Sequence, residues 1–233
     1  MEIIKTKNYQ ERSQETTAQV VKQLSQKPDS VLVFPADTTH AGMYAELGRL
    51  CQSGDISFKG AKAFHLDEYV GIEKNNPKSF RKLLDDKLFK QTDFRKENIY
   101  FLDGDQENLE KVCENYENRL NEIGPADLCI LGIGRNGHIA FDEPGVDPEI
   151  GVHRVKLDKE TVKVNQGPQE AITLGVSDIL KSKKIILSAS GQAKAEAIKR
   201  ALIGPISSKC PASFLRTHQN ITFILDKDAA SLL

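Results

Sequence analysis

The stretch Leu131–Gly145 reads LGIGRNGHIAFDEPG and begins at the end of a short apolar run, Leu128–Leu131. That run has the length and composition of a buried strand. Gly132, Gly134 and Gly137 follow it within six positions. Glycines after a strand let the backbone turn sharply and approach a ligand closely. The pattern therefore predicts a strand that ends at a ligand-binding turn.

The same turn carries an amide, an imidazole and two carboxylates within eight residues, on Asn136, His138, Asp142 and Glu143. These groups can supply general acid–base chemistry. In open α/β sheets the ligand crevice lies outside the carboxyl ends of the strands. We therefore expect an acid–base site at that edge of a sheet.

The turn has two other interpretations. Gly132, Gly134 and Gly137 have the spacing of a dinucleotide-binding turn, but His138 and an apolar pair follow where a helix should begin. No acidic residue ends a strand about 20 residues later, as ribose recognition needs. This argues against a nicotinamide or flavin. The other interpretation is a turn without chemistry, because a single histidine in a turn is often only a hydrogen-bonded polar group.

Bulk properties indicate an ordinary globular protein without a nucleic-acid or membrane partner. The 233 residues can bury a core without disulfides. The net charge is −1 and no stretch is strongly basic, so the footprint of nucleic-acid binding is missing. No segment resembles a signal peptide or the roughly 20 apolar residues of a spanning helix. We expect a cytoplasmic protein.

The four cysteines are scattered and form no Cys-x-x-Cys pair. This spacing argues against a structural zinc site and against a redox dithiol. No metal site is expected from the sequence.

Short apolar runs alternate with segments of helical spacing along the chain. The expected strands are 31–34, 61–66, 99–102, 127–131, 153–157, 185–188 and 221–225. The expected helices are 9–26, 41–51, 79–89, one that starts at an Asp105 N-cap and runs to 120, 169–180, and 195–202. The alternation predicts a mostly parallel open α/β sheet with helices on both faces, a modified Rossmann-like fold. Residues 1–233 contain no repeat or linker, so we expect one domain.

Polar turns follow four of the expected strands. They are Ala36–His40, Asp67–Tyr69, Asn136–Glu143 and Ser190–Lys194. In a parallel sheet all four can converge on one crevice.

Two blocks carry a family resemblance: His65–Gly71 reads HLDEYVG and Gly134–Gly145 reads GRNGHIAFDEPG. Together with Leu102–Gly104 and the lysine of Gly191–Ala195, they resemble the glucosamine-6-phosphate deaminase (isomerase) family over nearly the whole chain. The related 6-phosphogluconolactonases share the glycine-rich turn and its histidine. They lack the Ala-Phe-x-Glu-Pro continuation that stands here at Ala140–Pro144.

The resemblance implies isomerisation of a 2-amino sugar phosphate coupled to loss of ammonia, without metal or organic cofactor. Asp67 matches the base that carries the proton, and His138 matches the residue that assists ring opening. Asn136 and Glu143 match the residues that orient and tune the imidazole, and the family has Asp or Asn at the first of these. Gly137 matches a substrate-binding position.

Physical chemistry supports the role of Asp67 separately. A carboxylate in a crevice lined by Tyr69 and Phe141 is partly desolvated, which raises its pKa toward useful basicity. The alternative is that Asp67 only caps a helix and His138 only packs. The neighbouring Glu68 either shares this crevice or faces the other way, toward the solvent or an arginine.

The phosphate-binding half departs from the family pattern. The usual Gly-Gly-Thr-Pro turn is replaced by Asp37, Thr38, Thr39 and His40. A carboxylate beside a phosphate is repulsive, by about 1 kcal/mol or more at surface-like dielectric. The two threonine hydroxyls, a following helix N-terminus and a cationic His40 are expected to compensate.

The expected lid is also altered. Asn165 is followed by Gln166–Pro168 where the family carries a phosphate-holding arginine, and the segment is shorter. Ile150–Val152 replaces the usual Ser-Arg-Thr. Lys194 is the expected phosphate cation that remains.

The predicted function is conversion of glucosamine 6-phosphate to fructose 6-phosphate and ammonia. The alternatives are a galactosamine-6-phosphate isomerase, a lactonase-like sugar-phosphate hydrolase, and a non-catalytic sugar-phosphate sensor. The family includes monomers and hexamers, so homo-oligomerisation stays open.

Overall fold

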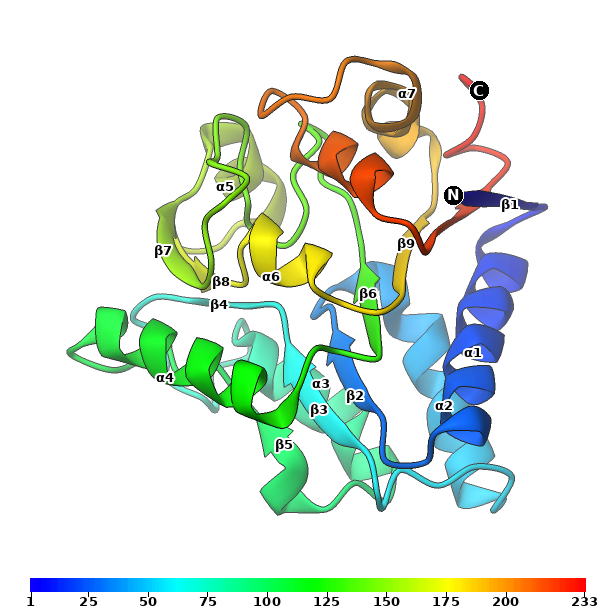
Figure 1. Ribbon diagram of the computed structural model, residues 1–233, viewed down its shortest axis with the longest axis vertical. Helices are drawn as coiled ribbons and strands as arrows, with labels where there is room; N and C mark the ends of the chain where they lie inside the picture. Colours follow the sequence, from blue (N-terminus) through cyan, green and yellow to red (C-terminus); the bar gives the residue numbers. More distant parts are fainter.

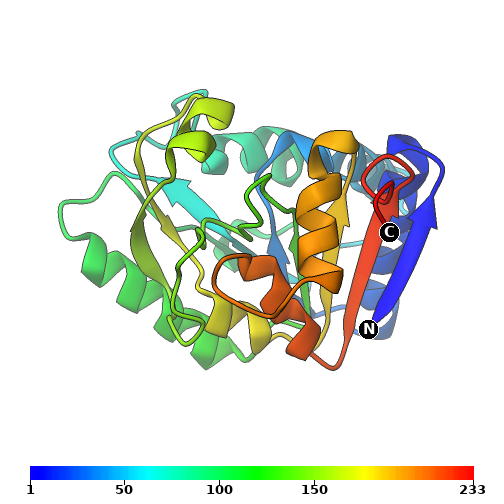
Figure 2. The ribbon, with the colours of Figure 1, turned by 90° about the horizontal axis from the view of Figure 1, so that it is seen from above.

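The computed structural model describes all residues, 1–233. Seven strands form one parallel sheet. In spatial order they are β1 (Glu2–Thr6), β10 (Ile221–Asp226), β9 (Ile185–Ala189), β6 (Leu128–Leu131), β2 (Val31–Phe34), β3 (Lys62–His65) and β5 (Ile99–Tyr100). Figures 1 and 2 show the two chain ends close together, beside the paired strands β1 and β10.

A second, three-stranded sheet is antiparallel. Its order is β4 (Asp67–Tyr69), β8 (Glu170–Thr173) and β7 (His153–Lys156). The chain passes from β3 of the large sheet to β4 of the small one through Leu66 alone. This short passage places Asp67 where the two sheets meet.

Helices cover both faces of the large sheet (Figure 2). They are α1 (Tyr9–Gln26), α2 (Ala41–Gln52), α3 (Phe80–Lys87), α4 (Leu109–Ile123), α5 (Lys159–Asn165), α6 (Val176–Leu180) and α7 (Ala195–Ile203). Short 3₁₀ turns lie at Thr38–His40, Phe89–Gln91, Lys96–Asn98, Gln192–Lys194 and Pro211–Thr217. No helix combines the length and apolar character needed to cross a membrane.

The two faces of the sheet belong to two separate cores. Along β2, Val31 and Val33 pack into the core shared with α4, α6 and α7, whereas Leu32 and Phe34 pack into the core shared with α1, α2 and α3. Successive side chains of a strand point to opposite faces, so a strand buried on both sides is apolar throughout. The prediction of a mostly parallel α/β sheet with helices on both faces is confirmed.

Three local predictions were wrong, and strand β1 and helix α5 were missed. Asp67–Tyr69, expected as a polar turn, forms strand β4. Residues 169–180 are not one helix: Glu170–Thr173 forms β8, the central strand of the small sheet, and α6 follows. The N-cap of α4 is Asn108, not Asp105: its side chain accepts a hydrogen bond from the Lys111 N–H at 2.9 Å. Strand β1 was not predicted, because it is a mostly exposed edge strand with no apolar run.

Candidate active site

A cavity of about 520 Å³ lies beyond the carboxyl ends of the parallel strands. Its walls include Asp37–Thr39 after β2, Asp67 after β3, Gly132–Arg135 after β6 and Lys194 after β9. The four polar turns therefore meet at one cavity. His138 also lines it.

Asp67 is the first residue of β4 and its side chain lines the cavity while only 7% of the residue is exposed. Burial, and then the charges of Glu68 and Asp37, raise the pKa of Asp67 well above its usual value. A carboxylate whose charge is poorly solvated is a stronger base once it is ionised.

Glu68, in contrast, faces the start of α3. Its Oε2 accepts hydrogen bonds from Ser79 Oγ at 2.7 Å and from the Arg81 N–H at 3.0 Å, and its Oε1 accepts from the Phe80 N–H at 3.1 Å. A carboxylate at a helix N-terminus satisfies free N–H groups and the helix dipole. Glu68 therefore holds α3 in place and does not line the cavity.

The ring of His138 lies against the backbone of Gly134. A Cβ atom at position 134 would be 2.2 Å from His138 Cε1, so only glycine leaves room for the imidazole there. The ring atom Nδ1 is 3.4 Å from Glu143 Oε2 and 3.4 Å from Thr161 Oγ1. The glycine-rich turn thus positions the histidine, and a carboxylate and a hydroxyl face its Nδ1.

Asn136 and Glu143 support the histidine from outside the cavity. Asn136 Nδ2 donates to Glu143 Oε2 at 2.6 Å, and Asn136 Oδ1 accepts from the His138 N–H at 3.2 Å. Burial would raise the pKa of Glu143, but the interactions with His138, Thr161 and Asn136 outweigh it and hold that pKa below its usual value. Glu143 is therefore ionised at neutral pH beside the imidazole.

The lid segment, which we define as residues 159–168, covers one side of the site. The N-cap of its helix α5 is Asp158, whose backbone N–H donates to Glu143 Oε1 at 3.2 Å. At the other end, Lys78 Nζ donates to the carbonyl of Gln166 at 2.7 Å. The lid is thus bonded at both ends to residues that flank the cavity.

Aromatic rings line the wall beside the lid. Tyr69 packs on Phe80 and on Phe141, with ring centroids 4.7 and 5.5 Å apart, and all three residues line the cavity. This apolar wall removes water from the side of Asp67 and is consistent with its raised pKa.

The turn after β2 differs from the expectation. Asp37 caps the 3₁₀ turn, and its Oδ1 accepts from the His40 N–H at 3.0 Å and lies 2.7 Å from His40 Nδ1. His40 is completely buried and does not line the cavity, so the expectation that it donates to the substrate is corrected. Thr38 and Thr39 do line the cavity.

Gly137 is also outside the cavity lining. It packs against Cys210 with φ +95°, a conformation that side chains other than glycine's rarely adopt. Its role is to close the turn that carries His138.

Three cationic residues line the cavity, Lys78, Arg135 and Lys194, and Lys78 is already bonded to the lid. Lys194 Nζ donates to the carbonyl of Ile133 at 2.6 Å. Burial lowers the pKa of Lys194, while the charge of Asp37 opposes this shift. Arg135 also lines the cavity but was missed, although it is the single basic residue within the glycine-rich turn.

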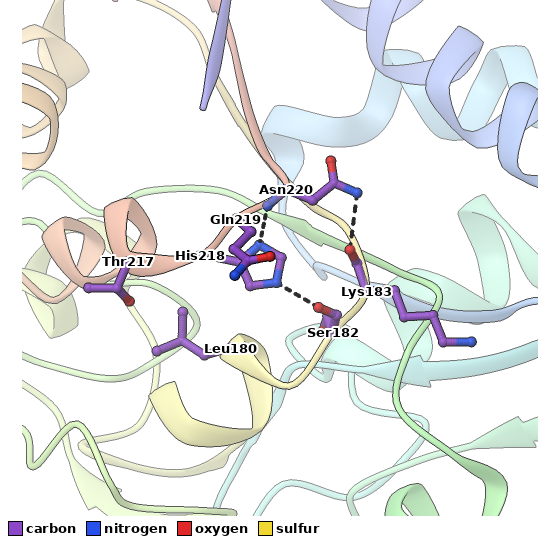
Figure 3. Close-up of a pocket in the computed structure, with 7 residues that line it drawn as sticks. All are labelled: Leu180, Ser182, Lys183, Thr217, His218, Gln219 and Asn220. Carbon is purple, nitrogen blue, oxygen red and sulfur yellow. Dashed lines mark hydrogen bonds between the residues drawn. The ribbon is translucent and has the colours of Figure 1, made fainter.

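A second cavity, of about 380 Å³, lies at the opposite, amino ends of β9 and β10 (Figure 3). It is lined by Leu180, Ser182, Lys183, Thr217, His218, Gln219 and Asn220. His218 Nε2 lies 2.7 Å from the Ser182 carbonyl, and His218 Nδ1 accepts from the Asn220 N–H at 3.1 Å. Both ring nitrogens are used within the wall, so this cavity offers no free acid–base group.

Comparison with known proteins identifies the family. The family of glucosamine-6-phosphate isomerases and 6-phosphogluconolactonases matches residues 5–224. A glucosamine-6-phosphate deaminase of a Thermoanaerobacter species is 40% identical over the whole chain and 95% of its own length. That of Clostridium acetobutylicum is 38% identical over the whole of both chains.

Solved structures agree. The structure of a monomeric glucosamine-6-phosphate deaminase superposes with a TM-score of 0.98 at 36% identity, over the whole of both chains. A 6-phosphogluconolactonase from Trypanosoma brucei shares the fold, with a TM-score of 0.82 at 21% identity over 100% of this chain and 98% of that one. The chain belongs to the family of glucosamine-6-phosphate isomerases and 6-phosphogluconolactonases.

Proposed function

We propose that the chain is an enzyme that converts glucosamine 6-phosphate to fructose 6-phosphate and ammonia. The observation that carries this function is that a buried carboxylate, Asp67, and a supported imidazole, His138, line one cavity. Two relatives that match the whole chain at 40% and 38% identity are glucosamine-6-phosphate deaminases.

The first chemical step is opening of the sugar ring. A proton leaves the anomeric hydroxyl and a proton reaches the ring oxygen, which breaks the bond between C1 and that oxygen. His138 is the group that moves these protons, because it lines the cavity and its Nδ1 lies 3.4 Å from Glu143 Oε2. Asn136 is a positioning residue that acts through Glu143 and the backbone of His138.

The second step is proton transfer between carbons. Asp67 removes the proton from C2 of the open aldose while a proton reaches the oxygen on C1, which gives an enolamine. Asp67 then returns its proton to C1, which gives a protonated imine at C2. Water adds to the imine and ammonia leaves, so the product is the 2-ketose phosphate. The pKa of Asp67 is raised by its burial, as a carbon-proton base requires.

The same residues bear on the other candidate functions. A galactosamine-6-phosphate isomerase would use the same proton transfers on the sugar epimeric at C4. A lactonase has no use for a base at C2 and would release no ammonia. A non-catalytic sensor has little need of both Asp67 and His138. Assays on the two amino sugar phosphates and on a lactone therefore separate these alternatives.

Cellular setting and assembly are part of the proposal. We expect residues 1–233 to act as one domain in the cytoplasm. The similarity to a monomeric deaminase over the whole of both chains favours a monomer over a homo-oligomer. Light scattering on the purified chain measures this directly.

The test is ammonia release from glucosamine 6-phosphate by the wild type, by Asp67→Asn and by the exposed control Asp105→Asn. The wild type and the control should release ammonia at equal rates, whereas Asp67→Asn should be inactive and still bind substrate. If the wild type releases ammonia from neither glucosamine 6-phosphate nor galactosamine 6-phosphate, the proposal is overturned. Normal turnover by Asp67→Asn would remove Asp67 as the proton carrier.

A further inference from the structure

The carboxylate of Asp37 fills the space between two turns of the cavity. Its Oδ1 accepts a hydrogen bond from the backbone N–H of His40 and also faces the His40 ring. Both groups lie in the helical turn that leads into α2. Its Oδ2 lies over the other turn, 2.8 Å from where a Cβ of Gly132 would be. An anion bound between a helical N-terminus and a glycine-rich turn would occupy this same place.

Positive groups surround that carboxylate. The buried Arg12 donates to the carbonyl of Thr39 beneath the turn and to Ser188 Oγ at 2.8 Å. Burial would raise the pKa of Asp37, but His40, with a smaller contribution from Lys194, outweighs it and holds that pKa below its usual value. Asp37 is therefore ionised at neutral pH and is a permanent anion of the site.

Arg135 has no such partner. Its side chain makes no ion pair and no hydrogen bond within the protein, although it lines the cavity. Arg200 donates to the carbonyl of Arg135 at 3.0 Å, which fixes the backbone from which the guanidinium projects. The charge of Arg135 also lowers the pKa of Lys194, so the two cations are close enough to repel.

A phosphate dianion between Arg135 and Lys194 would remove that repulsion and gain charge-assisted hydrogen bonds. A guanidinium suits this role because its donors match the geometry of a phosphate in a bidentate contact. The hydroxyls of Thr38 and Thr39 line the same cavity and can donate to the remaining oxygens.

We propose that Asp37 is a built-in anion that occupies the anion position of the turn after β2, and that Arg135, with Lys194, holds the phosphate of the substrate instead. This inference rests on the proposed function, because it assigns the phosphate end of the same site. It makes Arg135 a determinant of affinity for phosphorylated substrates and Asp37 a determinant of where the phosphate lies.

The first test is Arg135→Gln, with Lys199→Gln as the control. Lys199 is exposed on α7 and does not line the cavity, and its replacement removes the same charge. For Arg135→Gln, the KM for glucosamine 6-phosphate should rise at least about tenfold while kcat changes less than about twofold, since a charge-assisted contact is lost outside the reacting atoms. Lys199→Gln should match the wild type in both constants.

Inorganic phosphate provides a readout that needs no turnover. It should raise the Tm of the wild type and of Lys199→Gln in a concentration-dependent manner, and the shift should largely disappear in Arg135→Gln. A KM and a phosphate-induced Tm shift that both survive in Arg135→Gln would overturn the assignment of Arg135.

The second test is Asp37→Ser, because serine can still cap the helical turn without carrying charge. Removal of the built-in anion should tighten the binding of inorganic phosphate by about fivefold, as expected for one nearby repulsive charge. Unchanged or weaker binding of phosphate by the folded variant would show that Asp37 does not occupy the anion position.

The two hypotheses fail in different ways. If the wild type releases no ammonia but phosphate stabilises it and not Arg135→Gln, the proposed function is wrong and the phosphate anchor stands. If the wild type turns over and Arg135→Gln keeps its KM, the anchor is wrong and the function stands.

Discussion

The side-chain amide of Asn136 donates to Glu143 Oε2 at 2.6 Å, while its oxygen accepts from the backbone N–H of His138 at 3.2 Å. One amide thus joins the carboxylate that faces the imidazole to the main chain that carries it. Because Glu143 also binds the N-cap of the lid helix, this amide connects the histidine, its carboxylate and the lid.

Replacement of Asn136 by leucine should lower kcat about tenfold. Leucine has a similar size but leaves the Glu143 carboxylate without the Asn136 donor and the His138 N–H without its acceptor, and each loss costs about 1–3 kcal/mol. Steady-state kinetics measure the effect, and a thermal melt shows whether the fold is kept. Unchanged kcat would contradict a positioning role for the amide.

Asn136→Asp is the matched variant, since aspartate keeps the shape and adds a charge. A carboxylate placed 2.6 Å from Glu143 Oε2 replaces a donor by a second acidic group, and two carboxyl groups this close share one proton. The acidic limb of kcat/KM should therefore differ between this variant and the wild type. A profile that coincides with the wild type would show that Asn136 has no electrostatic effect on His138.

Gly134→Ala should reduce kcat about a hundredfold. The new Cβ would meet His138 Cε1 at 2.2 Å, so the ring must leave its position, and a displacement of about 1 Å can cost that much. The exposed Gly60→Ala, whose Cβ would lie 3.1 Å from the Pro28 carbonyl oxygen and outside the cavity, should leave kcat unchanged. Equal activity of both variants would mean that the ring moves without consequence.

Thr161→Val should lower kcat about three- to tenfold with little change in KM. Thr161 is buried in the lid helix, its hydroxyl lies 3.4 Å from His138 Nδ1, and it does not line the main cavity. A neutral hydrogen bond contributes about 0.5–1.5 kcal/mol.

Thr161→Ser keeps the hydroxyl and should behave as the wild type. If valine and serine give the same kcat and the same pH profile, the hydroxyl does not act on His138 and Thr161 only fills space in the lid.

Much of the fold could be predicted because its strands are short apolar runs that end in polar or glycine-rich turns. A strand buried on both faces has to be apolar throughout, so β2, β6 and β9 are evident in the sequence. Residues 169–180 could not be assigned in this way. Two apolar residues, Ala171 and Ile172, fit a strand or a helix equally well, and pairing with β4 and β7 decides between them.

The rule that parallel strands end at one edge of a sheet predicted which residues meet at the cavity, including Asp67 and His138. The directions of their side chains could not be predicted in this way. The burial of His40 depends on how the turn after β2 packs, and the free guanidinium of Arg135 depends on whether the carboxylates around it reach ion-pair distance. Neither property is encoded in local sequence, so one residue was wrongly placed in the cavity and the other was missed.

Asp142 provides a test of how burial acts on stability. It is completely buried, neither of its carboxylate oxygens has a hydrogen-bond partner among the side chains around it, and His153 Nε2 lies 3.8 Å away. Burial, and then the charges of Asp178 and Asp67, raise the pKa of Asp142 well above its usual value, while burial lowers the pKa of His153. Both shifts favour the uncharged forms, a carboxylic acid beside a neutral imidazole.

The raised pKa of Asp142 makes the stability of the folded protein depend on pH. Because the pKa of Asp142 is higher in the folded than in the unfolded state, its contribution to stability is fully present below about pH 4 and is lost as pH rises through the folded pKa. Asp142→Asn removes this loss, so the variant should have a Tm at pH 7 at least about 2 °C above the wild type. The gain should vanish near pH 4, and the exposed Asp29→Asn should show no such gain at either pH. A lower Tm for Asp142→Asn at pH 7 would mean that Asp142 is ionised in the folded protein and that an ion pair with His153, not a neutral acid, occupies this part of the core.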